Sequence, residues 1–388
     1  MARSSVRACH LGVALVLLAA ASTAQPQGAT STIRGVTSTT IVLGQSAPLS
    51  GSNKDLGDDI RNGALAYFKK VNDAGGVNGR RIELVTLDDA NDIKRSGENA
   101  RKLLEENGVL ALFGYASATL SRPALPFVEK HRVPFLAPFT GADPMRVFNP
   151  YVYNMRASYA DELEKIVDHY SRFGIKRFAI VHYEDVIGKE NYAAVDRALK
   201  QRNLSVVSVA AFKDRAKPEI ETGVKEVLKG DPDVIILTTL YKATSDFIKT
   251  ARKAGSNAQM VSNSFPGSTP LSKELGKDGV GVVIAQVVPS PSRITVPVVM
   301  EYRTAIDKLL GVQEYSFTSF ESFIAAKVTV EAIRRAGPNL TRETLLKALD
   351  GMANYDVGGY VVNFSPRNHN GSHFVDLTII GRDLKFKF

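Results

Sequence analysis

From Thr40 onward, short apolar runs rich in β-branched residues alternate with longer segments of helical periodicity. Such a run indicates a buried strand, and its repetition between helices is typical of a parallel sheet flanked by helices. The sequence therefore predicts an α/β fold. The expected strands are 41–47, 82–87, 109–113, 133–137, 177–182, 206–211, 234–239, 259–262 and 281–287, and the expected helices between them are 58–72, 96–107, 121–131, 159–173, 191–202, 219–229 and 244–254.

The alternation is interrupted once, at residues 151–158, and then resumes. At 388 residues, the chain is also longer than one hydrophobic core usually supports. Three further helices follow the last strand without new strands to cover, which indicates that the chain returns to the first sheet near Val287 and crosses once more near 366–371. We therefore expect two α/β lobes joined by a three-crossing hinge. The late helices are expected at 297–310, 318–335 and 341–349, lobe 1 at 38–156 plus 287–366, and lobe 2 at 157–286 plus 367–388.

The N-terminus has the residue order of a secretory signal peptide. Arg3 and Arg7 precede an apolar run at 11–21, and small residues follow up to Ala24, after which we expect cleavage. The run is well short of the roughly 20 residues that a membrane-spanning helix needs. Cys9 is the only cysteine and precedes the apolar run, which excludes a lipid-anchored cysteine at the cleavage point. We therefore expect an exported, soluble protein that has no cysteine after cleavage.

Charge and motif content exclude several function classes. The formal net charge is +9, but acidic and basic residues alternate throughout without a sustained basic block, so nucleic acid is not an expected partner. The chain has no GxSxG nucleophile elbow, no P-loop, no GxGxxG after the first strand and no HExxH. His369 and His373 form the one close histidine pair, but Asn370 and Gly371 between them indicate a loop, so no metal is expected. We expect neither an enzyme nor a cofactor.

The loops after the strands are where a ligand is expected, because ligands of open α/β sheets bind outside the carboxyl ends of the strands. These loops are rich in Gly, Ser, Thr, Phe and Tyr, which offer backbone N–H groups, hydroxyls and aromatic walls to a small polar ligand. Two carboxylate pairs lie there: we expect Asp88 and Asp89 to brace a loop, while a structural and a functional role stay open for Glu184 and Asp185. The loops are 49–57, 114–121, 139–144, 183–188, 240–244 and 262–267.

The segment 41–81 reads IVLGQSAPLSGSNKDLGDDIRNGALAYFKKVNDAGGVNGRR and resembles the first βαβ unit of the leucine/isoleucine/valine-binding protein family. Its first cleft loop carries Ser50, Gly51 and Gly57, and a glycine-rich turn at 72–79 leads into the second strand. We expect Gly63, with the alanine after it, to keep the intervening helix close to the sheet. The acidic pair after the second strand and the segment 134–138 match the family as well, and the likeness extends to the C-terminus.

This resemblance implies a type I periplasmic binding protein, in which two Rossmann-like lobes joined by the three-crossing hinge close on a ligand in a central cleft. It further implies a monomeric, periplasmic solute-binding subunit that captures a small molecule, either an amino acid or an organic carboxylate or amide. The implied partner is the permease of an ABC importer. The alternative is a ligand-binding module for a sensory receptor system, because the same lobes occur in signalling receptors.

The resemblance also implies a set of ligand-binding residues. The loops 116–119 and 139–141 match the segments that grip the ligand carboxylate in the family, and Tyr241 matches a tyrosine that lines the pocket. On physical grounds, the N-terminus of the helix expected to begin near Ser121, with the hydroxyls of Thr119 and Thr140, favours an anion. The predicted ligand-binding residues are Ala118, Thr119, Phe139, Thr140, Gly141, Tyr183, Asp185, Tyr241 and Ser264.

Three positions depart from the family pattern. Ser264 stands where the amino-acid binders of the family place a glutamate for the ligand ammonium, Ile187 replaces a tyrosine, and Leu56 replaces a tryptophan. A buried ammonium needs a carboxylate partner, because an unpaired charge in a closed cleft is costly. Two alternatives therefore stay open: Asp185 or Glu184 replaces the missing glutamate, or the ligand has no ammonium group.

Overall fold

The computed structural model describes residues 1–2, 34–51, 53–311 and 313–388. The expected signal peptide, residues 1–24, lies outside the described residues apart from the first two. The segment Met1–Thr32 separates from one compact unit, Ile33–Phe388, and everything below concerns that unit. Within the described part of the chain, every helix is too short or too polar to cross a membrane.

The first sheet has five parallel strands in the order β2-β1-β3-β4-β5. Five consecutive residues of its first strand, Leu43 to Ala47, are buried because helices cover both faces of the sheet. The strands are β1 (Thr40–Ala47), β2 (Arg81–Asp88), β3 (Ala111–Phe113), β4 (Phe135–Leu136) and β5 (Val152–Tyr153). The connecting helices are α1 (Lys54–Asp73), α2 (Ile93–Arg101), α3 (Ala118–Ser121) and α4 (Leu125–His131).

The second sheet has the order β14-β13-β10-β9-β8-β6-β7. Five of its strands are parallel to one another. The last two strands of the chain extend one edge of the sheet, and each is antiparallel to the strand before it in the sheet. The strands are β6 (Phe178–Tyr183), β7 (Val206–Phe212), β8 (Val234–Leu237), β9 (Gln259–Ser262), β10 (Val283–Gln286), β13 (Asp376–Ile380) and β14 (Phe386–Lys387). The helices are α5 (Tyr159–Arg172), α6 (Val186–Lys200), α7 (Ile220–Leu228), α8 (Tyr241–Lys253) and α9 (Ser268–Leu275).

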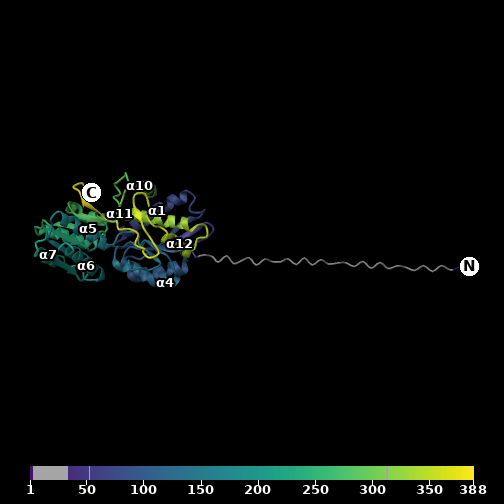
Figure 1. Ribbon diagram of the computed structural model, residues 1–388, viewed down its shortest axis with the longest axis horizontal. Coiled ribbons are helices and arrows are strands. Elements are labelled where there is room, and N and C mark those ends of the chain that lie inside the picture. Colours follow the sequence, from purple (N-terminus) through teal and green to yellow (C-terminus); the bar gives the residue numbers. More distant parts are fainter. Residues whose placement is uncertain (3–33, 52, 312) are drawn as a thin grey trace. The chain divides into compact units, whose positions relative to one another are not determined.

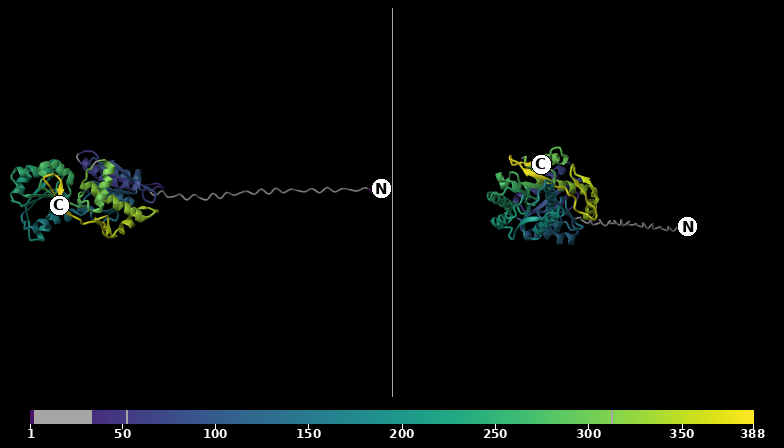
Figure 2. Two further views of the ribbon diagram at one scale, coloured as in Figure 1. Left: turned by 90° about the horizontal axis from the view of Figure 1, so that it is seen from above. Right: turned by 60° about the vertical axis from the view of Figure 1, so that its left-hand side comes forward.

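The late helices return to the first lobe, as the sequence predicts. They are α10 (Pro297–Leu310), α11 (Phe317–Ala336) and α12 (Arg342–Asp350), and a short hairpin of β11 (Tyr355–Asp356) and β12 (Val361–Val362) follows them. Helices α1 and α11 pack against each other, and Figures 1 and 2 show the purple and yellow-green segments together, apart from the teal strands. This arrangement gives two α/β lobes.

Gly63 has a different role from the one expected. A Cβ atom at Gly63 would lie 1.9 Å from the carbonyl oxygen of Ser319 on α11, so the glycine permits close contact between α1 and α11. The expectation that it keeps α1 close to the sheet is therefore wrong. The reason is that α1 is covered on its outer side by a helix from the far end of the chain, which a local pattern does not reveal.

The chain passes between the two sheets three times, after β5, after β10 and before β13. Two of the passages run side by side, because the N–H of Asn154 donates to the carbonyl of His369 at 2.8 Å and the N–H of Gly371 donates to the carbonyl of Asn154 at 2.8 Å. The three-crossing hinge is thereby present. The residue boundaries predicted for the lobes stay predictions, since the sheets assign strands and not the residues that connect them.

Candidate ligand-binding cleft

A cleft of about 380 Å³ lies where loops of the two lobes meet. Its walls are formed by loops at the carboxyl ends of strands, as expected for open α/β sheets. The first lobe contributes Leu56, Ala118, Thr119, Phe139 and Thr140, the second contributes Ile187, Arg215, Leu240, Ser264 and Phe265, and Arg156 and Tyr159 come from the first crossing and the start of α5. The volume is within the range of small-molecule sites.

The wall from the first lobe begins at the N-terminus of α3. Ser117 is the N-cap, and its hydroxyl accepts a hydrogen bond from the N–H of Leu120 at 3.2 Å. The helix therefore begins at Ala118, and the expectation of a helix start near Ser121 is wrong, because the serine four residues earlier caps the turn. The hydroxyl oxygen of Thr140 accepts from the N–H of Ala142 at 3.1 Å.

The wall from the second lobe presents Arg215, which lies between β7 and α7. Its Nε donates to the carboxylate of Asp185 at 2.7 Å, and its guanidinium lies 4.7 Å from the ring centroid of Tyr183 and 5.8 Å from that of Phe265. Asp185 also caps α6 by accepting from the N–H of Gly188 at 2.9 Å. Asp185 and Tyr183 thus stand behind Arg215 and hold it, instead of lining the cleft themselves.

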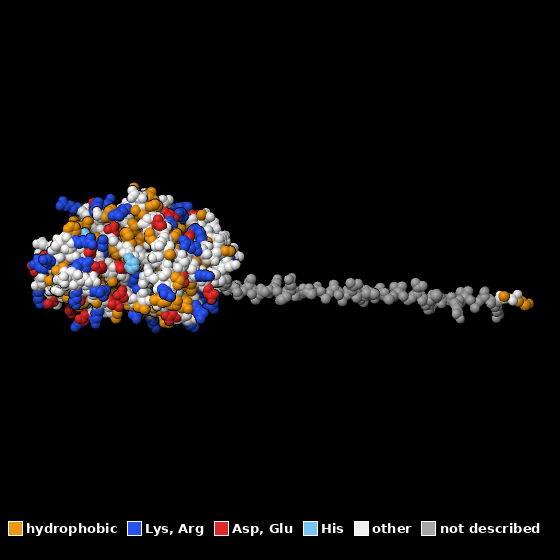
Figure 3. All heavy atoms as spheres, in the orientation of Figure 1, with side chains coloured by type: hydrophobic (Ala, Val, Ile, Leu, Met, Phe, Trp, Pro, Cys, Tyr) orange, Lys and Arg blue, Asp and Glu red, His pale blue; other side chains and the backbone are white. Residues whose placement is uncertain are grey.

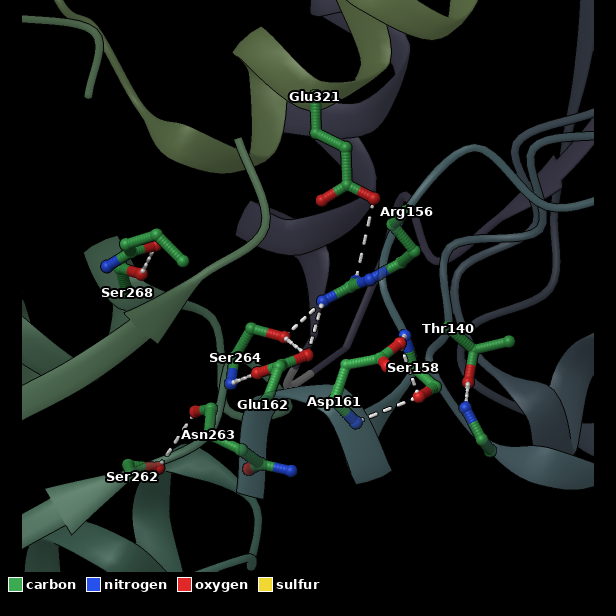
Figure 4. Close-up of polar contacts among 12 residues, drawn as sticks. Thr140, Arg156, Ser158, Asp161, Glu162, Ser262, Asn263, Ser264, Ser268 and Glu321 are labelled. Atoms are coloured by element: carbon green, nitrogen blue, oxygen red, sulfur yellow. Dashed lines mark hydrogen bonds and ion pairs between the residues drawn. The ribbon is translucent and has the colours of Figure 1, made fainter. Parts of the chain in front are cut away.

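The floor of the cleft carries a buried charge cluster of Arg156, Glu162 and Glu321, shown in Figure 4. Nη2 of Arg156 lies 3.4 Å from Glu162 and contacts the hydroxyl of Ser264, and its Nη1 lies 3.6 Å from Glu321. Both oxygens of Glu162 also accept hydrogen bonds from Ser264, at 2.6 Å from the backbone N–H and 2.8 Å from the hydroxyl. The side chains of Arg156 and Glu162 are only 2% and 0% exposed, so the cluster is part of the interior.

Burial dominates the electrostatics of this cluster. It raises the pKa of Glu321 to about 7, against the opposing effect of Arg156 and with a further rise caused by Glu162. Burial also raises the pKa of Glu162, although Arg156 and the hydrogen bonds from Ser264 oppose it. Burial acts to lower the pKa of Arg156, but the two carboxylates outweigh it and raise the pKa overall, so the guanidinium stays charged.

The structure brings five of the nine predicted site residues to the cleft surface: Ala118, Thr119, Phe139, Thr140 and Ser264. Tyr241 lines an adjoining pocket of about 220 Å³ that shares Leu56, Leu240 and Phe265 with the cleft. Gly141 lies behind the wall, where its carbonyl accepts from the N–H of Tyr159 at 2.8 Å. Three predicted residues, Gly141, Tyr183 and Asp185, therefore do not line the cleft.

Sequence reasoning missed Arg156, Arg215 and Phe265. The sequence did contain a signal for Arg156. This charged residue stands between the apolar stretch of β5 and the N-cap of α5, where the chain passes from one hydrophobic core to the other. No comparable signal marks Arg215, which lies in a mixed-charge loop. The positions Leu56, Ile187 and Ser264, which depart from the family pattern, do line the cleft.

The charge lining the cleft is of one sign. Among the described residues that border it, the charged side chains are Arg156 and Arg215, and none is a carboxylate. The outer surface differs, since Figure 3 shows basic and acidic side chains interspersed over the face drawn. The charged side chains that border the cleft are therefore both arginines, and the carboxylates that pair with them do not border it.

Known proteins share this architecture and sequence pattern. The profile of the periplasmic binding protein family matches residues 40–381. A Leu/Ile/Val-binding protein homolog 8 of Brucella abortus is 24% identical over 347 residues, which are 85% of each chain. A substrate-binding periplasmic protein from Ralstonia solanacearum has a TM-score of 0.81 at 32% identity and covers 89% of this chain and 99% of its own. A possible leucine/isoleucine/valine-binding protein from Rhodopirellula baltica has a TM-score of 0.83 at 28% identity, with coverage of 90% and 96%. The chain belongs to the periplasmic binding protein family, of the Leu/Ile/Val-binding type.

Proposed function

We propose that this protein is the periplasmic solute-binding subunit of an ABC importer and that its ligand is a small organic acid without an ammonium group. The protein captures this ligand in the cleft and delivers it to the permease without transforming it. One observation carries the choice of ligand: the charged side chains that border the cleft are Arg156 and Arg215, with no carboxylate among the described lining residues.

An ammonium group is disfavoured at this floor. The guanidinium of Arg156 contacts the hydroxyl of Ser264, the position at which the amino-acid binders of the family were inferred to carry a glutamate. The group that borders the cleft there is the guanidinium of Arg156, and Glu162 and Glu321, which balance it, lie outside the cleft lining, so the floor offers a ligand ammonium no carboxylate to contact. Burying an ammonium without a partner is costly. An amino acid is therefore a poorer fit than the corresponding acid.

A carboxylate finds donors on both walls. Nε and Nη2 of Arg215 both contact the carboxylate of Asp185. No residue described in the structure accepts a hydrogen bond from its Nη1, and the Arg215 side chain is 33% exposed. Thr119 and Thr140 border the same cleft from the first lobe. Leu56, Ile187 and other apolar residues supply surface for a hydrocarbon body, as in most small-molecule sites.

Delivery to a permease is supported by the two-lobed, hinged fold, because closure of such lobes buries the ligand and changes the surface that a partner meets. The predicted signal peptide at residues 1–24 supports a periplasmic location. Relatives named as binding proteins, and the absence of any catalytic motif in the sequence, support a binding role without chemistry.

A thermal-shift screen with matched ligand pairs tests this proposal. The mature protein is unfolded and refolded to remove carried-over ligand, and is then tested with isocaproate against leucine and with hydrocinnamate against phenylalanine, each acid being the amino acid without its amino group. A ligand at about 100 times its dissociation constant stabilises by roughly 2.7 kcal/mol, which is several degrees for a chain of this size. We expect the acids to raise the melting temperature and the amino acids to leave it unchanged.

Two variants show whether the effect comes from the cleft. Arg215→Gln removes a charged donor whose hydrogen bond to an anion contributes about 1.5–3 kcal/mol, so acid binding should weaken roughly tenfold or more. Arg177→Gln is the matched control, because Arg177 precedes β6 at the opposite end of the same sheet and pairs with Asp233. Shifts with amino acids alone, or acid binding that ignores Arg215→Gln, would contradict the proposed ligand.

A further inference from the structure

The cluster at the cleft floor contains one cation and two carboxylates. Arg156 comes from the crossing between β5 and α5, Glu162 from α5 and Glu321 from α11, so the cluster joins both lobes. Glu162 and Glu321 are 0% and 9% exposed at their side chains. Two ionised carboxylates sharing one guanidinium leave a net negative charge in the interior, which is unfavourable in a poorly solvated site.

The two carboxylates are not equivalent. Glu162 accepts two hydrogen bonds from Ser264 in addition to its contact with Arg156. Among the described residues, Glu321 contacts one cation, Arg156, whose Nη1 lies 3.6 Å from the carboxylate. The ionised form of Glu162 is therefore better supported. Glu321 is the member of the cluster that binds a proton when one is taken up.

The surroundings of Glu321 contain no further cation close enough to balance it within the described chain. Tyr360 and Tyr159 lie near the cluster and are neutral, because burial raises the pKa of each phenol. Arg146 is directed to the backbone, with its Nη1 donating to the carbonyl of Arg156 at 2.9 Å. Two cavities of about 10 Å³ border Glu321, each close to the space that one water needs.

We propose that binding of an organic acid in the cleft is coupled to the uptake of a proton by Glu321. This inference rests on the proposed function, because it requires an anionic ligand beside Arg156. With Glu321 ionised, the guanidinium is shared between two carboxylates and a bound anion adds a third negative charge. With Glu321 protonated, the guanidinium is balanced by Glu162 alone, and the anion meets a neutral cluster.

Linkage fixes the sign of the effect. If protonation of Glu321 favours the anion, then the anion must favour protonation of Glu321 by the same factor. The pKa of Glu321 is about 7 without ligand, so a change of pH near neutrality alters its occupancy. Affinity for the acid is expected to be constant well below that pKa and to fall as pH rises through it, by up to about tenfold per pH unit for one coupled proton.

Isothermal titration calorimetry with isocaproate tests the coupling. Wild-type protein is titrated between about pH 5.5 and pH 8.5, at each pH in two buffers of different ionisation enthalpy, so that the number of protons taken up is measured directly. We expect uptake of a fraction of a proton near pH 7, and affinity roughly tenfold weaker at the highest pH than at the lowest.

Glu321→Gln keeps the size of the side chain and removes the titration. It should bind isocaproate with the affinity of the wild type at low pH, without proton uptake and without the loss at high pH. The matched control is Glu331→Gln, because Glu331 lies on the same helix, on the surface, paired with Arg335, and this variant should retain the wild-type pH dependence.

The outcomes separate this inference from the proposed function. Isocaproate binding that is independent of pH and buffer, or a Glu321→Gln variant that keeps the wild-type pH profile, overturns the coupling and leaves acid binding intact. No acid binding even at the lowest pH overturns both. The buffer comparison uses the wild type alone, so an absence of proton uptake overturns the coupling even if Glu321→Gln does not fold.

Discussion

Replacing Arg156 by methionine is the perturbation that most directly tests the charge cluster at the cleft floor. Methionine keeps much of the length and can still contact Phe139 and Tyr159, over which the guanidinium lies at 5.1 and 5.8 Å. The change therefore removes charge more than volume. Glu162 and Glu321 are left in the interior without their cation.

Breaking a buried ion pair by removing one partner costs about 3–5 kcal/mol, since the remaining charge is uncompensated. For a chain of this size each kcal/mol lowers the melting temperature by roughly 2–4 °C, so Arg156→Met should lose on the order of 6–20 °C at about pH 9, where both carboxyls are ionised. Burial already raises the pKa of both carboxyls, and loss of Arg156 raises them further. The cost is therefore full above those raised values and declines as pH falls toward the ordinary value of 4.5.

Urea unfolding followed by circular dichroism at about pH 9 and about pH 5.5 measures both parts of this prediction. Arg177→Met is the control, because Arg177 is solvent-exposed and exposed ion pairs contribute little. The reasoning is refuted if Arg156→Met loses less than about 1 kcal/mol at the higher pH, or if the loss is the same at both pH values.

Three further changes have expected outcomes. Gly63→Ala places a Cβ 1.9 Å from the carbonyl oxygen of Ser319, so it should lower the free energy of unfolding by about 1–3 kcal/mol or more, and a wild-type melting temperature would refute the close contact of α1 and α11. Ser158→Ala removes the capping box of α5 and should cost about 1 kcal/mol in urea unfolding, whereas Ser158→Thr, which keeps the hydroxyl, should retain the stability if the cap is correctly assigned. Glu321 holds a proton in the folded chain between pH 4.5 and about 7 that the unfolded chain has lost. The wild-type free energy of unfolding should therefore fall by up to about 3 kcal/mol as pH rises through this window, and Glu321→Gln should remove that component, which unfolding at several pH values checks.

The alternation of apolar runs and helical segments was enough to predict the lobes, because it reflects local propensity and burial that act along contiguous residues. The helix predicted at 297–310 coincides with α10, whose ends carry their own signals: a proline in the first turn and Gly311, at φ 71°, at the end. The helix predicted at 121–131 begins earlier, because two serines can cap this turn and only the structure distinguishes Ser117 from Ser121. Helix α9, Ser268–Leu275, was not predicted from the sequence.

The cleft was located from the strand ends, but its charges were not predicted. Arg156 meets Glu321 only because α11 folds back onto the first lobe, and Arg215 covers Asp185 because the loop after β7 lies beside the end of β6. Asp185 was predicted as a ligand contact, and the structure shows its carboxylate paired with Arg215. Pairings of this kind join segments far apart in the chain, and neither spacing nor periodicity encodes them. Asp88 was interpreted correctly as a loop brace, accepting from the N–H of Leu49 and the hydroxyl of Ser50 at 2.8 and 2.6 Å, because that contact follows from the strand end itself.

The central claim is that the cleft selects an acid over its amino analogue, and one comparison by calorimetry tests it most directly. Refolded protein at about pH 6 is titrated with hydrocinnamate and then, in a separate experiment, with phenylalanine. The arginine-lined cleft predicts that the acid binds and that the amino acid binds at least tenfold more weakly, which corresponds to about 1.4 kcal/mol. Phenylalanine binding as tightly as hydrocinnamate, or more tightly, would contradict the claim and would mean that a carboxylate of this chain pairs with the ligand ammonium.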